Sequence, residues 1–181
     1  LSTTETAHFA FSYMRKTLYL IRHAQAEDSA PMTSDFEREL TTKGIMDSAK
    51  MGGYFALKGI HPEAWIASSA YRTVTTAKVM MERLKVDVET MIATRELYSG
   101  GLQAYLKMVN EAPAEASSIA IVGHNPEISY FAEYLTHDEF ISMAKCGVII
   151  LTFENLEWAE ISRRSGTFER YFTPKSLLNE Q

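Results

Sequence analysis

The feature that most constrains the fold is a set of short, continuously apolar segments that end in polar residues. Residues 17–21 read Thr-Leu-Tyr-Leu-Ile, and residues 64–67 and 119–122 are similarly apolar. Apolar runs of this length without polar alternation are typical of strands that are buried on both faces of a parallel sheet. The segments therefore predict an α/β fold.

Helical patterns and loops separate these strands. The stretch 24–39 is polar and is expected to be a loop, after which Thr41 or Thr42 can cap a helix. A proline is favourable at the first position of a helix, so Asn125 can cap a helix that begins at Pro126. The other expected helices span residues 43–57, 71–84 and 102–109.

The remaining strands complete the predicted sheet. Residues 86–92 are expected to form a strand, and residues 148–153 and 158–162 flank Glu154-Asn155 as an antiparallel hairpin at the edge of the sheet. Alternating strands and helices favour helices on both sides of such a sheet. We therefore expect a three-layer α/β/α domain, mainly parallel with an antiparallel edge hairpin.

Polar residues that can bind an anion follow three of the buried strands. Arg22 and His23 follow the first, Ser69 and Arg72 come soon after the second, and His124 follows residues 119–122. Ligands of open α/β sheets bind outside the carboxyl ends of the strands, so these side chains are expected to converge there. Arginine forks and the amides at a helix start suit the oxygens of a phosphoryl group.

Four motifs carry a resemblance to a known family. They are Leu-Tyr-Leu-Ile-Arg-His-Ala at 18–24, Leu-Thr-Thr-Lys-Gly at 40–44, Ser-Ser-Ala-Tyr-Arg at 68–72 with Thr76, and Val-Gly-His-Asn-Pro at 122–126. In order and spacing they resemble the signatures of the histidine phosphatase superfamily, which is phosphoglycerate mutase-like in fold. The small SixA-type phosphohistidine phosphatases are the most similar branch, from about residue 17 to the Phe-Thr-Pro-Lys segment at 172–175.

The resemblance implies roles for four residues. His23 would be the nucleophile that carries the phosphoryl group, while Arg22, Arg72 and His124 would form the phosphate pocket and take part in catalysis. A histidine can attack phosphorus only when it is neutral, because an imidazolium has no free lone pair. The superfamily often has glycine where this chain has Ala24.

Three further residues are weaker candidates. Glu96 resembles the acidic position of the SixA branch and could act as the general acid and later as the base, although it could equally pair with Arg95. Arg38 belongs to an Asp-x-x-Arg element and, with Ser69, could contact the substrate.

The leading functional hypothesis is a phosphatase without metal or cofactor that dephosphorylates a phosphohistidine on a phosphotransfer protein. Within the same fold, the alternative is a phosphatase for small phosphomonoesters such as sugar phosphates or nucleotides. A non-catalytic phosphate-binding module is an alternative of another class, but it would not need both His23 and His124. Fold alone does not choose among these functions.

Composition excludes some partners and bounds the domain. A net charge of −5 argues against a nucleic-acid surface, and no apolar run is long enough to span a membrane. One cysteine, Cys146, favours a reducing compartment, so we expect a cytoplasmic protein. Residues 1–13 are interpreted as an extension of uncertain origin and residues 14–181 as one histidine phosphatase domain; the oligomeric state stays open.

Overall fold

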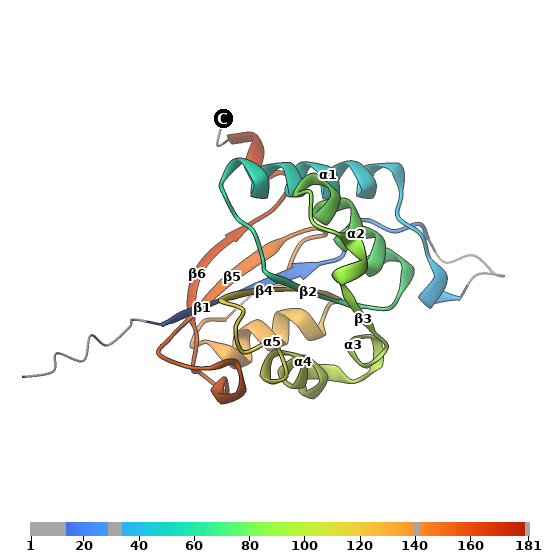
Figure 1. The fold of residues 1–181 in the computed structure, drawn as a ribbon. Coiled ribbons are helices and arrows are strands. Elements are labelled where there is room, and N and C mark those ends of the chain that lie inside the picture. Colours follow the sequence, from blue (N-terminus) through green and yellow to red (C-terminus); the bar gives the residue numbers. More distant parts are fainter. Residues whose placement is uncertain (1–13, 29–33, 140–141, 180–181) are drawn as a thin grey trace, which may run out of the picture.

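The computed structural model describes residues 14–28, 34–139 and 142–179, so the expected extension 1–13 lies outside the described residues. Its centre is a six-stranded sheet with strand order β3-β2-β4-β1-β5-β6 (Figure 1). The strands are β1 (Arg15–Arg22), β2 (Ala64–Ser68), β3 (Ile92–Thr94), β4 (Ser118–Gly123), β5 (Val148–Glu154) and β6 (Thr167–Phe172). Strands β3, β2, β4 and β1 are parallel to one another. Strand β5 is antiparallel to both of its neighbours, β1 and β6.

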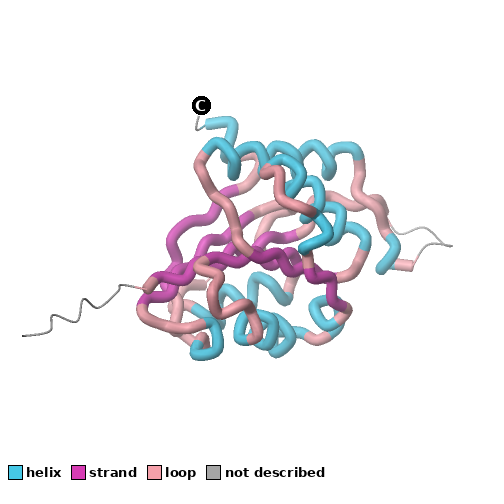
Figure 2. Tube along the Cα trace, in the orientation of Figure 1, coloured by secondary structure: helices cyan, strands magenta, loops and turns pink. Residues whose placement is uncertain are grey.

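Helices cover both faces of the sheet, as Figure 2 shows. One layer contains α1 (Thr42–Leu57) and α2 (Tyr71–Arg83), and the other contains α3 (Glu96–Ser99), α4 (Gly101–Asn110) and α5 (Glu127–Leu135). The predicted three-layer, mainly parallel fold is confirmed. Within the described part of the chain, no helix is both long and apolar enough to cross a membrane.

The central strand β1 contributes to a hydrophobic core on each side. Leu18 and Leu20 pack into the core beneath α4 and α5, while Ile21 packs into the core beneath α1 and α2. Successive side chains of a strand point to opposite faces, so an uninterrupted apolar run is needed where both faces are covered. Burial on both faces holds the carboxyl end of β1 in a fixed position.

The start of α1 fixes the loop that follows β1. The side chain of Thr41 accepts a hydrogen bond from the Gly44 amide at 3.0 Å, which confirms the predicted cap. A Cβ atom at Gly44 would collide with the backbone carbonyl of Gln25, so only glycine permits this approach. The helix and the loop two residues beyond His23 are therefore held against each other.

The expected strand over 86–92 is wrong except for its last residue. The side chain of Asp87 accepts a hydrogen bond from the Glu89 amide at 3.0 Å and starts a short 3-10 turn at Val88–Thr90. An aspartate that binds the backbone two residues on competes with strand pairing. Only Ile92–Thr94 pairs with β2.

The second strand of the expected hairpin, 158–162, is also wrong. Trp158–Glu160 forms a 3-10 turn, and the Trp158 indole donates to the carbonyl of Ala116 at 2.7 Å. The strand that pairs with β5 is Thr167–Phe172, and β5 itself lies between β1 and β6. The antiparallel edge is present, but its outer strand comes later in the chain.

The expected start of α5 is shifted as well. Pro126 is the residue before the helix rather than its first residue, and Asn125 does not cap it. The Asn125 amide donates instead to Ser142 at 2.6 Å and to the carbonyl of Met143 at 3.1 Å. The Asn125 side chain thus ties the start of α5 to the segment before β5.

Candidate active site

The sheet brings the two candidate histidines together. Arg22 pairs with Gly123 in the parallel register of β1 and β4, so His23 and His124 are the next residue on each strand. The His23 amide donates to the Gly123 carbonyl at 3.0 Å, and the centroids of the two imidazole rings lie 5.3 Å apart. Adjacent parallel strands therefore place both rings at the carboxyl edge.

The imidazole of His23 is held in one tautomer. Its Nδ1 lies 2.7 Å from the carbonyl oxygen of Ala24, which can only accept a hydrogen bond, so Nδ1 carries the proton. The Ala24 amide is in turn bound to the Thr76 hydroxyl at 3.0 Å, and the Cys146 amide donates to the His23 carbonyl at 3.2 Å. Nε2 of a neutral His23 consequently keeps its lone pair.

The surroundings of His23 favour its neutral form. Burial is the main cause that lowers the pKa of His23 to about 3; the hydrogen bond to Ala24 opposes this shift, and the nearby His124, Arg72 and Lys145 contribute to it. The side chain is only 6% exposed. Desolvation and neighbouring positive charge both penalise an imidazolium, so His23 is neutral at physiological pH.

His124 is positioned by a serine and a tyrosine. Its Nε2 lies 2.8 Å from the Ser68 hydroxyl, and its amide donates to the Tyr105 hydroxyl at 3.0 Å. The Tyr105 hydroxyl lies so close to Gly123 that a Cβ atom there would collide with it. Burial lowers the pKa of His124 to about 4, helped by Arg72 and Arg22. Nδ1 is buried and has no hydrogen-bond partner among the described residues.

Each of the two arginines has one buried N–H group that makes no hydrogen bond within the described residues. Arg22 donates from Nη1 to the Met143 carbonyl at 2.5 Å, and Arg72 donates from its two terminal nitrogens to the carbonyl and carboxylate of Asp35. The Nε atoms of both arginines are buried without a partner in the described part of the chain. Buried polar groups are normally satisfied, so these donors suit an anionic ligand.

Asp35 is the counter-ion of this site, a role that no sequence motif predicted. Its carboxylate accepts from Arg38 at 2.8 Å, from Arg72 at 2.9 Å and from the Tyr98 hydroxyl at 3.0 Å. The bond to Arg38 is the main cause that lowers the pKa of Asp35 to about 2, with Tyr98 and Arg72 contributing. Arg38 also donates to the Glu27 carbonyl at 2.7 Å. Arg38 therefore lies at the rim of the site, where it holds Asp35.

The other two candidates contact groups outside this cluster. Both oxygens of the Glu96 carboxylate lie 2.9 Å from the Lys107 ammonium, and both side chains are about half exposed. The Ser69 amide donates to the Thr94 carbonyl at 3.0 Å. Among the described contacts, none joins Glu96 or Ser69 to His23, and Ser68 rather than Ser69 touches a histidine.

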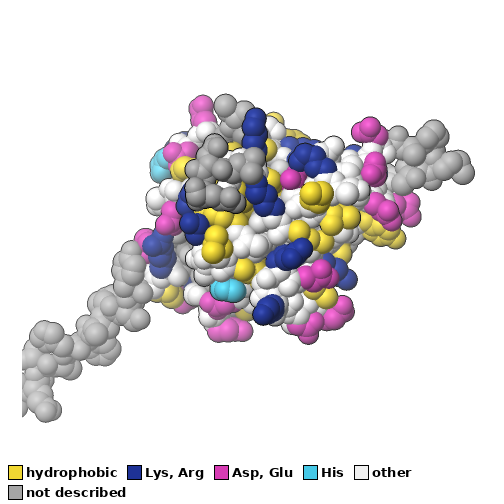
Figure 3. Space-filling view, turned by 90° about the horizontal axis from the view of Figure 1, so that it is seen from above, with side chains coloured by type: hydrophobic (Ala, Val, Ile, Leu, Met, Phe, Trp, Pro, Cys, Tyr) yellow, Lys and Arg dark blue, Asp and Glu magenta, His cyan; other side chains and the backbone are white. Residues whose placement is uncertain are grey.

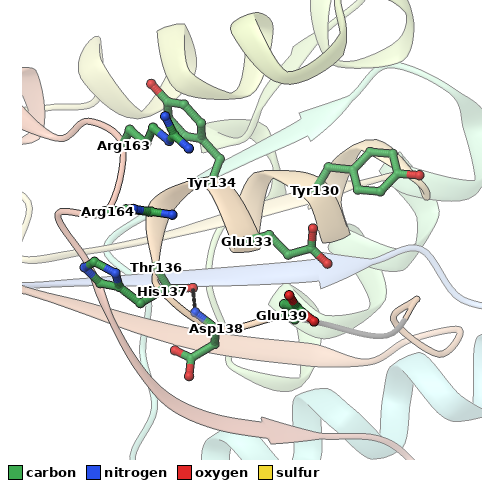
Figure 4. A pocket seen from close by; sticks show the side chains of 9 residues that line it. All are labelled: Tyr130, Glu133, Tyr134, Thr136, His137, Asp138, Glu139, Arg163 and Arg164. Carbon is green, nitrogen blue, oxygen red and sulfur yellow. Dashed lines mark hydrogen bonds between the residues drawn. The ribbon is translucent and has the colours of Figure 1, made fainter.

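A separate hollow lies at the far end of α5 from His124 (Figure 4). Figure 4 shows Arg163 near the ring of Tyr134, and Thr136 accepts a hydrogen bond from the Asp138 amide at 3.2 Å. Although acidic and histidine side chains border this hollow, no group of three or more metal-ligating residues in the described ranges is arranged to hold an ion.

The lowered pKa values of the histidines predict a pH-dependent stability. An unfolded histidine, with a pKa near 6.5, takes up a proton below that pH, whereas folded His23 and His124 stay neutral towards pH 4. The free energy of unfolding should therefore fall as pH decreases from 6.5 to 4.5, by about 1 kcal/mol per pH unit for each histidine. Urea unfolding of His23→Gln should show a shallower slope, and the exposed-site control His61→Gln should keep the wild-type slope. Identical slopes for all three proteins would contradict the buried neutral state.

The fold and site together define a class of protein, a phosphoglycerate mutase-like domain with two histidines and two arginines at the carboxyl edge of its sheet. Residues 18–117 match the model of the histidine phosphatase superfamily (branch 1), which is more than half of the chain. The chain belongs to this superfamily and is a phosphatase of the histidine phosphatase type.

Solved structures and one curated relative are similar along most of the chain. The protein histidine phosphatase SixA complexed with tungstate is 20% identical, with a TM-score of 0.76 over 89% of this chain and 99% of that one. A proposed phosphohistidine phosphatase SixA from Nakamurella multipartitia is 24% identical, with a TM-score of 0.73 over 88% and 96%. An uncharacterized protein from Picosynechococcus sp. is 27% identical over 73% of this chain and 82% of its own. The structural likenesses show the fold.

No sequence motif predicted that Tyr105 and Lys145 would contribute to the site. Tyr105 is fully buried in the core, yet its hydroxyl accepts a hydrogen bond from the His124 amide. Lys145 precedes β5, a strand with no motif, and reaches the site only because β5 pairs with β1. A polar tip on a buried aromatic residue was the one signal that could have identified Tyr105.

Proposed function

We propose that this protein is a phosphohistidine phosphatase and that His23 is its nucleophile. The observation that carries the proposal is the hydrogen bond from Nδ1 of His23 to the Ala24 carbonyl. It leaves the lone pair of Nε2 free in a site where Arg22, Arg72 and His124 retain buried nitrogen atoms for an anion. A non-catalytic phosphate-binding module would not need a histidine held in this tautomer.

The first step transfers the phosphoryl group to the protein. The Nε2 lone pair of His23 forms a bond to phosphorus while the bond from phosphorus to the substrate imidazole nitrogen breaks, and that nitrogen takes a proton from water. Arg22 and Arg72 bind the phosphoryl oxygens and stabilise their charge in the transition state. His124 donates from Nδ1 when its Nε2 accepts from the Ser68 hydroxyl.

The second step regenerates the protein. Water attacks the phosphorus of phospho-His23, the bond from phosphorus to Nε2 breaks, and Nε2 regains its lone pair as inorganic phosphate leaves. The proton released by water goes to phosphate or solvent. The Ala24 carbonyl holds Nδ1–H throughout, so His23 returns to its starting tautomer.

The acidic groups near the site favour a phosphohistidine substrate. Glu96 is paired with Lys107, and the pKa of Asp35 is about 2, so Asp35 is ionised and cannot donate a proton at neutral pH. An alkoxide leaving group needs a general acid, whereas the imidazole of phosphohistidine is a better leaving group and needs less help. The assignment of Glu96 as general acid stays a prediction.

The partner that follows from this proposal is a histidine-phosphorylated phosphotransfer protein, and the proposed compartment is the cytoplasm. A substrate panel tests the choice. We expect a higher kcat/KM for a phosphohistidine protein than for sugar phosphates or nucleotides, with chelator leaving the rate unchanged. A clear preference for a small phosphomonoester would make the protein a small-molecule phosphatase instead.

A further inference from the structure

A groove lined by lysines runs along one side of the candidate active site. It has a volume of about 480 Å³, and one wall is the face of α1 that carries Lys43, Asp47 and Lys50. These residues share a helix face because they are spaced four and three positions apart. Lys145, which precedes β5, and Lys175, which follows β6, also line the groove. We call this feature the lysine groove.

The lysine groove begins next to the nucleophile. Gln25, which also lines it, is two residues beyond His23, and Lys145 directly precedes Cys146, whose amide donates to the His23 carbonyl at 3.2 Å. The charge of Lys145 helps to lower the pKa of His23. A ligand that delivers its phosphoryl group to His23 can therefore reach the groove with a neighbouring part of its surface.

The charge of the lysine groove is opposite to that of the whole chain. Four lysines and one aspartate line it, whereas the chain carries a net charge of −5. Figure 3 looks down on the side of the molecule that carries α1, where Lys and Arg side chains lie across the middle of the face and acidic ones gather mainly at its margins. Such a local positive field attracts an anionic surface.

Two of the four lysines of the groove interact with other groups of the protein. Lys43 forms an ion pair with Asp47 at 2.5 Å, and Lys50 donates to the Pro174 carbonyl at 2.6 Å. Within the described ranges, no hydrogen bond or ion pair engages Lys145 or Lys175. The pKa of Lys145 is lowered by partial burial and by Arg22, Arg38 and Arg72, against a smaller effect of Asp28. An anion beside Lys145 would offset this repulsion.

We propose that the lysine groove docks an acidic surface of the histidine-phosphorylated protein whose phosphoryl group reaches His23. This inference rests on the proposed function and adds the means of partner recognition. A protein fits better than a small molecule with a second phosphate, because Lys43, Lys145 and Lys175 are exposed and come from three separate segments of the chain. Flexible exposed lysines act as point charges that steer a complementary surface, and they contribute mainly to association rate and selectivity.

The test compares a large and a small substrate on charge-reversal variants. The double variant Lys43→Glu/Lys175→Glu changes one lysine of α1 and one that follows β6, and a glutamate in the first turn of α1 suits the helix dipole. The probes are a histidine-phosphorylated phosphotransfer domain with an acidic surface and free phosphohistidine. The matched control is Lys85→Glu, which follows the end of α2 about 20 Å from the turn that holds Arg72.

We expect the double variant to lose about 10-fold or more in kcat/KM for the phosphorylated domain. Its kcat/KM for free phosphohistidine should stay within about twofold, since the groove acts on docking rather than on the phosphoryl group. Added salt should slow the wild type on the domain much more than it slows the double variant. Lys85→Glu should behave as wild type with both substrates.

The outcomes separate this inference from the proposed function. If the wild type releases phosphate from both probes but the double variant is unimpaired on the domain, the docking surface is refuted and the proposed function stands. Equal losses on both probes would also refute it, because the lysines would then act on the phosphoryl site itself. If the wild type releases phosphate from neither probe, the proposed function fails.

Discussion

His23→Ala is expected to abolish turnover of a phosphohistidine substrate, with a loss in kcat of about 10⁴-fold or more, because the variant has no nucleophile. Steady-state phosphate release measures the loss. The imidazole of His23 is buried, and the Ala24 carbonyl holds it in the tautomer whose Nε2 has a free lone pair. We identify no other described side chain that could replace this nucleophile. His124 cannot substitute for it, because its Nε2 is engaged with Ser68.

The control for this prediction is His61→Ala, which removes an exposed imidazole that precedes the amino end of β2, whereas the candidate site lies at the carboxyl ends of the strands. It should keep wild-type activity. Circular dichroism should show that His23→Ala is folded, and His23→Gln provides a second inactive variant that retains a polar side chain. Activity of a folded His23→Ala within tenfold of the wild type would overturn the assignment of the nucleophile.

Arg72→Ala is expected to lower kcat/KM by about 10² to 10³-fold, the usual cost of removing a donor that stabilises transition-state charge. Arg72 is 6% exposed, and its buried Nε has no partner among the described residues. Its Nε–H can bind a phosphoryl oxygen directly, and its terminal nitrogens can do so when they release the Asp35 carboxylate. Steady-state kinetics on the phosphorylated protein measure the effect.

Two further variants make the Arg72 prediction specific. Arg72→Lys keeps the positive charge but loses the forked geometry, so it should recover only part of the activity. Arg83→Ala, at the other end of α2, should match the wild type and thereby exclude a general effect on the helix. If Arg72→Ala remained within threefold of wild type, Arg72 would not bind the transferred phosphoryl group.

The sequence predicted the centre of the fold well because the signal there is local. The runs at 17–21, 64–67 and 119–122 lie in β1, β2 and β4, and burial on both faces requires their uninterrupted apolar residues. Prediction failed at the edges of the sheet. Asp87 starts a turn inside the segment 86–92 that was expected to be a strand, and β6 has only one buried residue, which is too little alternation to indicate a strand.

The residues of the candidate site also fall into two groups, those that the sequence could predict and those that it could not. The sequence predicted that Arg22, His23, Arg72 and His124 would converge, because each ends a strand or comes within about one turn after it, and the carboxyl ends of these strands meet. Asp35, Tyr105 and Lys145 reach the site through loops or across the core, and no spacing along the chain indicates such contacts. The pairing of Glu96 with Lys107 was unforeseen for the same reason, as the two residues come from different helices.

We propose that Nε2 of His23 carries the phosphoryl group between the two steps, and a trapping experiment can detect this intermediate. The wild type is mixed briefly with a ³²P-labelled phosphohistidine protein and quenched in alkali, where a phosphohistidine survives, and the labelled residue is located by peptide mapping and NMR. We expect label on Nε2 of His23 and none on His23→Ala. Label on His124, on Nδ1 of His23, or equally on His23→Ala would contradict it.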